Sequence, residues 1–313
     1  MWTIIISVLL LVGYQRSFRS VVYGVAVAEI INGTVLGIVS MGKLRISGKI
    51  IQPDQIKALL KYALPLIPAS TLSWVVTSTD KLMLRTMCTY EELGLYGAAS
   101  KIVAALGIIQ TCFLTIWVPV AFRWYEEGKD HKYFTLVMKV VAAVMSCACL
   151  GILLCKNLVG WFLGEDFMRA IAVFPFLILS PLFYTISETT VLGISFQRKT
   201  GYNIIISLTS GAANLVLNYF LLPIWGGVGA AIATGVSSIV FFGMRTWLSR
   251  RLWYRFPVGL FAVLICVIVL NCAAHTFMSG AIPYVLSLCS LLLLVAVLLP
   301  QILVSVRSLK QDK

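Results

Sequence analysis

The chain has 313 residues, of which 60% are hydrophobic and only 12% are charged. That charged share is about half the share found in soluble domains, so the composition excludes an ordinary soluble globular protein. The net charge of +13 would suit nucleic acid, but the lysines and arginines lie between long apolar stretches. We therefore expect the charge to orient the chain against anionic lipid, with membrane lipids and not nucleic acid as partners.

Ten apolar stretches follow one another along the chain, at residues 3–13, 21–39, 62–84, 94–119, 134–155, 170–192, 203–222, 228–244, 257–274 and 282–304. A helix that spans a bilayer needs roughly 20 apolar residues, and most of these stretches reach that length. Backbone groups in lipid must be hydrogen-bonded internally, so the stretches should be helices. The sequence predicts an all-α integral membrane protein of about ten transmembrane helices, the first of them truncated.

Positive charge alternates between the segments that separate these stretches. The basic segments and the tail contain Lys43, Arg45, Lys49, Lys57, Lys61, Arg123, Lys129, Lys132, Arg198, Lys199, Arg245, Arg250, Arg251, Arg255, Arg307, Lys310 and Lys313. Cationic loops stay in the cytoplasm. We therefore expect a multi-pass protein of a bacterial cytoplasmic (inner) membrane with both termini in the cytoplasm.

Proline and glycine mark two of the predicted helices. Pro65 and Pro68 interrupt the third stretch, where each removes a backbone hydrogen bond and bends the helix. The bend fits either a packing kink or a flexing transporter helix. Gly226, Gly227 and Gly229 lie where only a few residues separate two stretches, and they permit a sharp turn and close helix packing.

Ionisable residues within membrane spans are costly and are candidates for function. Asp80, Lys81 and Arg85 lie near the outer end of the third stretch, and Lys101 lies at a similar depth in the fourth. Two interpretations stay open for them. Asp80 forms an ion pair with Lys101 or Lys81 that fixes two helices together, or the cations form a patch that binds an anionic headgroup such as a diphosphate.

Two further carboxyl groups lie within apolar stretches. Glu29 is either a packed, protonated carboxyl or a group that lines a cavity, and Glu188 lies near the end of its span, within reach of water near Arg198 and Lys199. We treat both as candidates for ion coupling or for a cavity wall. The cysteines form no C-x-x-C pair and the two histidines are far apart, so we expect neither a metal site nor a cofactor.

Several segments resemble a known family. They are LKYALPLIP (60–68), TDKLML (79–84), GLYGAASKI (94–102) and QRKTGYNIIISLTSGAANLVLNYFLLPIWGGVGAAIAT (197–234). Together they resemble the second half of bacterial polysaccharide flippases, the O-antigen and capsule exporters of the multidrug/oligosaccharidyl-lipid/polysaccharide superfamily. That family has an arginine after the aspartate, where this chain has Lys81, which keeps the charge but loses bidentate phosphate geometry.

The resemblance implies a transporter of two pseudo-symmetric lobes of six helices with a cationic central cavity. Residues 1–59 would end the first lobe and form a basic cytoplasmic linker, residues 60–250 would form the second lobe, and residues 251–313 an extra helix pair and tail. The first four helices of the family would be missing, which makes the missing lobe helices a partner if the chain is a fragment. Polysaccharide polymerase machinery is another implied partner.

The expected function is that of a flippase, and not of an enzyme. It would move a polyprenyl-diphosphate-linked oligosaccharide across the cytoplasmic membrane for lipopolysaccharide O-antigen or capsule synthesis. The alternative is a cation-coupled multidrug antiporter of the same superfamily, which an acidic cavity would favour. A membrane polysaccharide polymerase or glycosyltransferase is a third alternative, but it normally needs a sizeable catalytic loop outside the membrane, and the loops here are short.

Overall fold

The computed structural model describes residues 18–41, 78–158, 169–199 and 201–311. The chain divides into two compact units, residues 1–71 and 72–313, which are described separately. In the first unit the described element is helix α2 (Phe18–Met41), which falls on the second apolar stretch. Pro65 and Pro68 lie outside the described residues, so the predicted kink in the third stretch stays a prediction.

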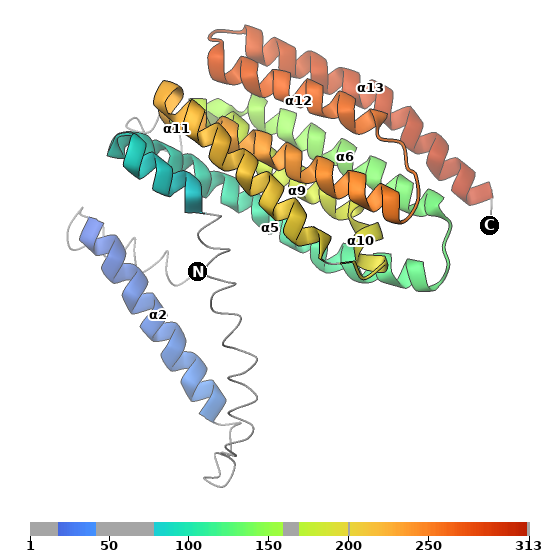
Figure 1. Cartoon of the computed structure of the whole chain (residues 1–313), viewed down its shortest axis with the longest axis horizontal. Helices are drawn as coiled ribbons and strands as arrows, with labels where there is room; N and C mark the ends of the chain where they lie inside the picture. The colour runs from blue at the N-terminus through green and yellow to red at the C-terminus, as the bar shows by residue number, and fades with distance from the viewer. Residues whose placement is uncertain (1–17, 42–77, 159–168, 200, 312–313) are drawn as a thin grey trace. The chain divides into compact units, whose positions relative to one another are not determined.

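The second unit is built from helices and turns throughout its described part (Figure 1). Residues 78–87 are helical and lead into a series of longer elements. These are α5 (Tyr90–Glu126), α6 (His131–Leu154), α8 (Ala170–Leu177), α9 (Leu179–Thr190), α10 (Leu192–Phe196), α11 (Tyr202–Leu252), α12 (Gly259–Phe277) and α13 (Ile282–Gln311). The prediction of an all-α membrane protein is confirmed.

Among the described residues, six helices are long and apolar enough to cross a membrane. One of them is the 51-residue α11, in which the backbone departs from helical geometry at Gly226, with φ 51° and ψ −127°. This element therefore comprises two helices joined by a tight turn, as the stretches 203–222 and 228–244 predict. The helix expected at 62–84 lies mostly outside the described residues, and so does the one at 3–13.

Helix starts follow from local capping. Thr89 precedes α5 and its hydroxyl accepts a hydrogen bond from the Glu92 amide at 3.3 Å. Asp130 precedes α6 and accepts from the Lys132 amide at 3.0 Å, which lowers the pKa of its exposed carboxyl. Such caps satisfy amides that have no partner inside the helix. The turn between the two helices passes through Gly128 at φ 64°, a conformation that favours glycine.

The sixth apolar stretch forms a helix with a local irregularity where α8 meets α9. The backbone at Ile178 stays helical, with φ −61° and ψ −26°, and its amide still donates to the Phe174 carbonyl at 3.3 Å. Pro181 follows this point and has no amide hydrogen, so the carbonyl four residues before it cannot receive the usual helical bond. Residues 170–190 together form one apolar span.

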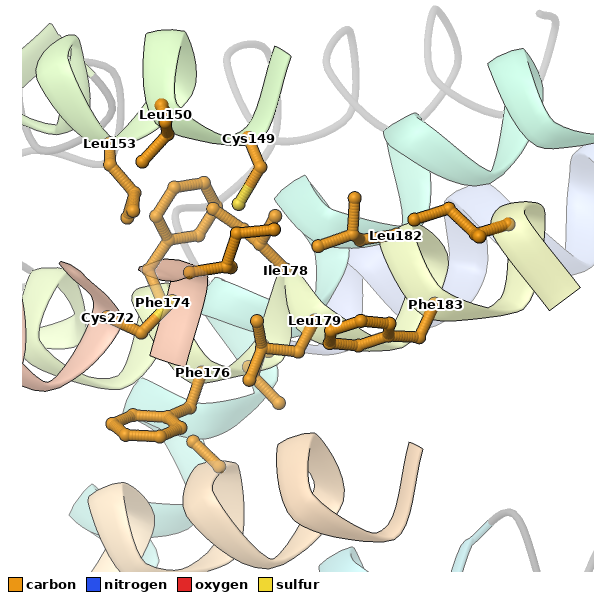
Figure 2. Close-up of a cluster of buried hydrophobic side chains, with 14 of the residues drawn as sticks. Cys149, Leu150, Leu153, Phe174, Phe176, Ile178, Leu179, Leu182, Phe183 and Cys272 are labelled. Carbon is orange, nitrogen blue, oxygen red and sulfur yellow. The ribbon is translucent and has the colours of Figure 1, made fainter. Parts of the chain in front are cut away.

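The α8–α9 pair is the centre of the core of this unit. It packs on α5, α6, α11 and α12, and α13 packs on α6 and α12. Figure 2 shows side chains from four of these helices meeting around Phe174, Ile178 and Leu179, which are at most 2% exposed. The same cluster includes Leu264 of α12 and Leu294 of α13. The C-terminal pair therefore shares one continuous core with the helices before it.

Large apolar side chains on the outside of the bundle are consistent with a lipid environment. On α5, Ile108 and Ile116 are 66% and 69% exposed, and further exposed aliphatic residues line α11 and α13. Lipid tails are as apolar as these side chains, so helix association in a membrane depends on close packing and not on hydrophobic burial. Close contacts between backbones are therefore the features whose loss should matter most.

The turn within α11 is the tightest such contact. A Cβ on Gly229 would overlap the Leu221 carbonyl oxygen and lie 2.7 Å from its carbon, so only glycine allows the two halves to approach. The turn is also tied to α5, because the Gly227 amide donates to Glu92 Oε2 at 2.8 Å. Gly226 has the positive φ that glycine tolerates. The roles predicted for these three glycines agree with the geometry.

We expect Gly229→Leu to prevent correct packing of the hairpin and to reduce the amount of folded protein recovered from membranes. The matched control is Gly243→Leu on the same element, where a Cβ meets nothing within 4 Å. Fluorescence size-exclusion of both variants measures the outcome. Equal, wild-type recovery of both would contradict the close approach.

Side-chain contacts gather the loops of this unit into two groups. At one end, Arg169 pairs with Glu91 at 2.7 Å, Glu92 holds the α11 turn, and Lys156 donates to the His275 carbonyl at 2.8 Å. At the other end, His131 stacks on Tyr254 with ring centroids 4.2 Å apart, and Tyr125 stacks on Phe196 at 4.1 Å. These are the two sets of loops that the charge alternation separates.

Candidate functional site

A cluster of polar side chains inside the helical bundle surrounds the carboxylate of Asp80. This carboxylate accepts three hydrogen bonds from neutral donors on two other helices, from the Tyr96 hydroxyl at 2.7 Å, the Asn218 amide at 2.6 Å and the Thr234 hydroxyl at 2.6 Å. Asn218 also donates to Asn214 at 3.0 Å. Charge-assisted bonds of this kind are among the stronger ones in proteins. The cluster joins residues 78–87 to α5 and to both halves of α11.

Two cavities border this cluster. The first has a volume of about 590 Å³ and lies between residues 79–80, α9 and α11. The second has a volume of about 410 Å³ and lies between residues 80–81, α5, α9 and α11. Both are lined by Asp80, Ser180, Tyr184 and Thr234, so they meet along the same polar edge.

The walls of the cavities combine hydroxyl and amide groups with apolar surface, which is the larger part of the first cavity. The hydroxyl and amide groups of the first cavity come from Thr79, Ser180, Tyr184, Ser207, Ser210, Asn214, Thr234, Ser237 and Ser238. Among the described lining residues, the charged ones are Asp80 in both cavities and Lys81 in the second. Groups of this type exchange hydrogen bonds with hydroxyl-rich ligands, and a carboxylate beside them also accepts from a sugar hydroxyl or attracts a cation.

The structure separates the four residues that the sequence grouped as a patch. Asp80 and Lys81 border the cavities, whereas Arg85 and Lys101 are exposed and line neither of them. Within the part of the chain that the structure describes, no ion pair joins Asp80 to Lys81 or Lys101, because the carboxylate is held by neutral donors. Of the three cations expected to line the cavity, Lys81 is the one that does so.

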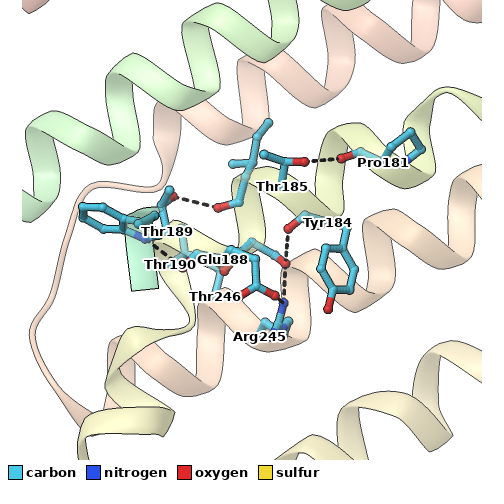
Figure 3. A network of polar contacts seen from close by, with 11 residues as sticks. Pro181, Tyr184, Thr185, Glu188, Thr189, Thr190, Arg245 and Thr246 are labelled. Atoms are coloured by element: carbon cyan, nitrogen blue, oxygen red, sulfur yellow. Dashed lines mark hydrogen bonds and ion pairs between the residues drawn. The ribbon is translucent and has the colours of Figure 1, made fainter. Parts of the chain in front are cut away.

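Glu188 forms an ion pair with an arginine that the sequence predicted to lie in a loop. Its carboxylate pairs with Arg245 of α11 at 2.7 Å, and both side chains are nearly buried, 12% and 11% exposed. Figure 3 shows the two side chains pointing at each other from α9 and α11. Arg245 also donates to Ser187 at 2.6 Å. The placement of Arg245 in a topogenic loop is therefore wrong, since the helix continues to Leu252 and carries this residue inside the bundle.

Aromatic rings connect this ion pair to the cavities. The Arg245 guanidinium lies 5.4 Å from the Tyr184 ring centre and 4.9 Å from that of Phe241. These two rings stack on each other at 5.7 Å, and both line the first cavity. The ion pair is thus linked to the first cavity through two of its lining rings, with an additional cation–π attraction.

The sequence did not predict the roles of Tyr96 and Thr234 as partners of Asp80, or of Arg245 as the partner of Glu188. Tyr96 and Thr234 lie in ordinary apolar surroundings and become significant only because the fold places them on Asp80. Arg245 carried a signal, because it stands five residues before the next arginine and follows an unbroken apolar run. If residue 245 had been assigned to the preceding helix, the sequence would have predicted a membrane-embedded cation with a carboxylate partner.

The remaining candidates are placed in part. Glu29 lies on α2 in the first unit, so its role at a cavity stays a prediction. Within the described residues, no group of three or more histidine, cysteine, aspartate or glutamate side chains is arranged to hold a metal ion.

Comparison with known proteins shows what this chain is similar to. A family model described as "Polysaccharide biosynthesis protein" matches residues 2–124. A protein of Shigella flexneri, described as a candidate O-antigen transporter, is 21% identical over 246 residues, which cover 76% of this chain. The chain is thus similar, over part of its length, to a polysaccharide biosynthesis family and to an O-antigen transporter, which confirms the resemblance to bacterial polysaccharide flippases.

A solved structure has a fold similar to that of this chain. The lipid II flippase MurJ in an inward closed conformation superposes with a TM-score of 0.66 at 15% identity, over 99% of this chain. The chain spans 58% of the Shigella relative and 65% of the flippase structure. The likeness shows the fold, which is that of an all-α membrane protein.

Proposed function

We propose that the chain takes part in moving a polyprenyl-diphosphate-linked oligosaccharide across a bacterial cytoplasmic membrane, for O-antigen or capsule synthesis. The observation that carries the proposal is the pair of cavities around Asp80, whose largely apolar walls carry hydroxyl and amide groups between helices of the bundle. A sugar loses many hydrogen bonds to water when it enters a bilayer, so a carrier must offer replacements. The serine, threonine and asparagine groups of the cavity walls supply such replacements.

Lys81 provides the group that suits the diphosphate. It lines the second cavity, while the carboxylate next to it is already engaged by Tyr96, Asn218 and Thr234. Its positive charge is therefore not neutralised by a contact with Asp80. In a poorly hydrated cavity, attraction between an ammonium group and a phosphate is stronger than in bulk water. Arg85 and Lys101 remain proposed contributors to this patch.

The second candidate is a cation-coupled drug antiporter of the same superfamily. The observation that favours it is the Asp80 carboxylate, which borders both cavities and would attract a cationic drug or a coupling ion. The two functions differ in substrate charge. Drug sensitivity of a deletion strain with intact surface polysaccharide would favour the antiporter.

The experiment for the preferred function is depletion of the protein in its host. We expect lipid-linked oligosaccharide to accumulate in the cytoplasmic leaflet while the surface polysaccharide disappears. Normal surface polysaccharide after depletion would contradict the proposal. Association with polymerase machinery is proposed as well, and co-purification of a polymerase with the tagged protein is its test.

For the arrangement in the membrane, we propose that residues 1–59 end a first lobe, residues 60–250 form a second lobe and residues 251–313 an added pair, with further first-lobe helices as a partner. Both termini would be cytoplasmic. Support comes from the basic loops, which lie between the described helices at the end of the bundle where His131 meets Tyr254.

Reporter fusions test this orientation. A fusion after Lys129 should report a cytoplasmic position and a fusion after Glu92 an external one, because cationic loops remain in the cytoplasm. An external signal after Lys129 would reverse the proposed orientation. The pair serves as its own control, since the two sites flank the same helix α5.

A further inference from the structure

A third cavity lies apart from the first two, at the C-terminal end of α11. Its volume is about 420 Å³, and its described lining residues are Trp247, Arg250, Arg251, Trp253, Tyr254 and Arg255. Three of the six are arginines and the other three are aromatic. Guanidinium groups bind phosphate, and tryptophan and tyrosine side chains favour the membrane–water boundary, so the cavity contains groups of both kinds.

One of the arginines is held in place by an aromatic ring, and all three lack an acidic partner among the described residues. The Arg251 guanidinium lies 3.9 Å from the Trp247 ring centre, an arrangement that fixes the side chain through cation–π attraction. In the part of the chain that the structure describes, no carboxylate forms an ion pair with Arg250, Arg251 or Arg255. Their guanidinium groups therefore keep donors for an anion in the cavity.

Neighbouring groups do not cancel the positive charge. The adjacent α5–α6 turn, whose His131 stacks on Tyr254, carries two acidic residues that pair with lysines of the same turn, Glu127 with Lys129 at 3.9 Å and Asp130 with Lys132 at 3.6 Å. Burial raises the pKa of the Tyr254 phenol to about 12, so it stays neutral at physiological pH. The helix C-terminus contributes only about half a negative charge against three full positive ones.

We propose that this cavity binds the phosphate group of a membrane lipid. The exposed ring of Trp247, 48% accessible, would lie among headgroups and acyl chains, while the arginines engage the phosphate oxygens. The inference uses neither Asp80 nor Lys81 and does not depend on the proposed transport function. A soluble phosphate shares the same chemistry, so the test separates the two sources.

The test uses the purified full chain in neutral detergent, with phosphatidylglycerol as the lipid probe and inorganic phosphate as the soluble one. The variant Arg250→Gln/Arg251→Gln/Arg255→Gln is compared with the control Arg198→Gln/Lys199→Gln/Arg307→Gln. Both remove three positive charges from segments predicted to lie on the same side of the membrane. Native mass spectrometry measures bound lipid, and thermal melting measures stabilisation.

We expect wild type and control to bind phosphatidylglycerol alike, and the arginine variant to bind it about tenfold or more weakly, since the loss of one charge-assisted bond has an effect of that size. Equal loss in both variants would show unspecific surface attraction and overturn the proposal. Stabilisation by inorganic phosphate alone, equal to that by the lipid, would overturn the lipid as ligand. If the triple variant is not recovered, Arg251→Gln and Arg255→Gln, both exposed, should each weaken binding, and unchanged binding in both would reject the site.

Discussion

Replacing Arg245 with alanine is expected to cause a large loss of stability. The substitution leaves the Glu188 carboxylate nearly buried without its 2.7 Å partner, and it also removes the donor to Ser187. Breaking one side of a buried ion pair costs about 3–5 kcal/mol. Thermal melting of the purified protein should show a large decrease, and much of the variant should be lost from membranes.

Two comparisons isolate the cause of that loss. Arg307→Ala removes an exposed arginine from α13, and surface changes of this kind stay within about 0.5 kcal/mol. The double variant Glu188→Met/Arg245→Met replaces both charges with apolar groups and should recover most of the stability. A melting temperature of Arg245→Ala equal to that of Arg307→Ala would contradict the assigned role of the pair.

The second large effect is expected at Lys81. Lys81→Ala should abolish oligosaccharide transport, because it removes the positive charge that lines the second cavity. Its side chain is exposed, so the protein should still insert and fold. Loss of a charge-assisted contact with phosphate should lower transport by at least about tenfold. Lys81→Arg keeps the charge and gains a bidentate fork, so it should retain transport.

The same assay determines how far the proposed patch extends. Lys101→Ala and Arg85→Ala alter cations that line neither cavity, and we expect smaller losses from them. Lys199→Ala is the control for an exposed cation outside the patch and should leave transport unchanged. If the Lys81→Ala variant is present at the wild-type level and transports at the wild-type rate, Lys81 does not bind the diphosphate.

Most of the fold was accessible from the sequence because membrane helices must be long, apolar and internally hydrogen-bonded. The turn at Gly226 was predictable, since three glycines in four residues interrupt a continuous apolar run. The single helix predicted over residues 170–192 agrees with one apolar span at residues 170–190, and the local irregularity at Ile178, beside Pro175 and Pro181, was not predicted. Proline signals a disturbed helix but does not determine whether the helix bends or breaks, because neighbouring packing decides the outcome.

The candidate site was only partly predictable. Asp80 and Lys81 stand out as charges in an apolar stretch, so they were found from composition alone. The partners of Asp80 were not, because Tyr96, Asn218 and Thr234 are ordinary side chains until helices from distant parts of the chain bring them together. The ion pair of Glu188 was not predicted because the last helix of α11 was expected to end at Met244, eight residues before its actual end at Leu252.

The most direct test of the transport proposal is flipping by the purified protein, together with any further lobe its host supplies, in proteoliposomes. A fluorescent polyprenyl-diphosphate oligosaccharide in the inner leaflet is followed by its accessibility to an external quencher. We predict that wild-type protein exposes this lipid far faster than protein-free liposomes do, and that Lys81→Ala gives the protein-free rate. Equal rates with wild-type protein and without protein, while a cationic drug is transported against a proton or sodium gradient, would contradict the flippase function and favour the antiporter.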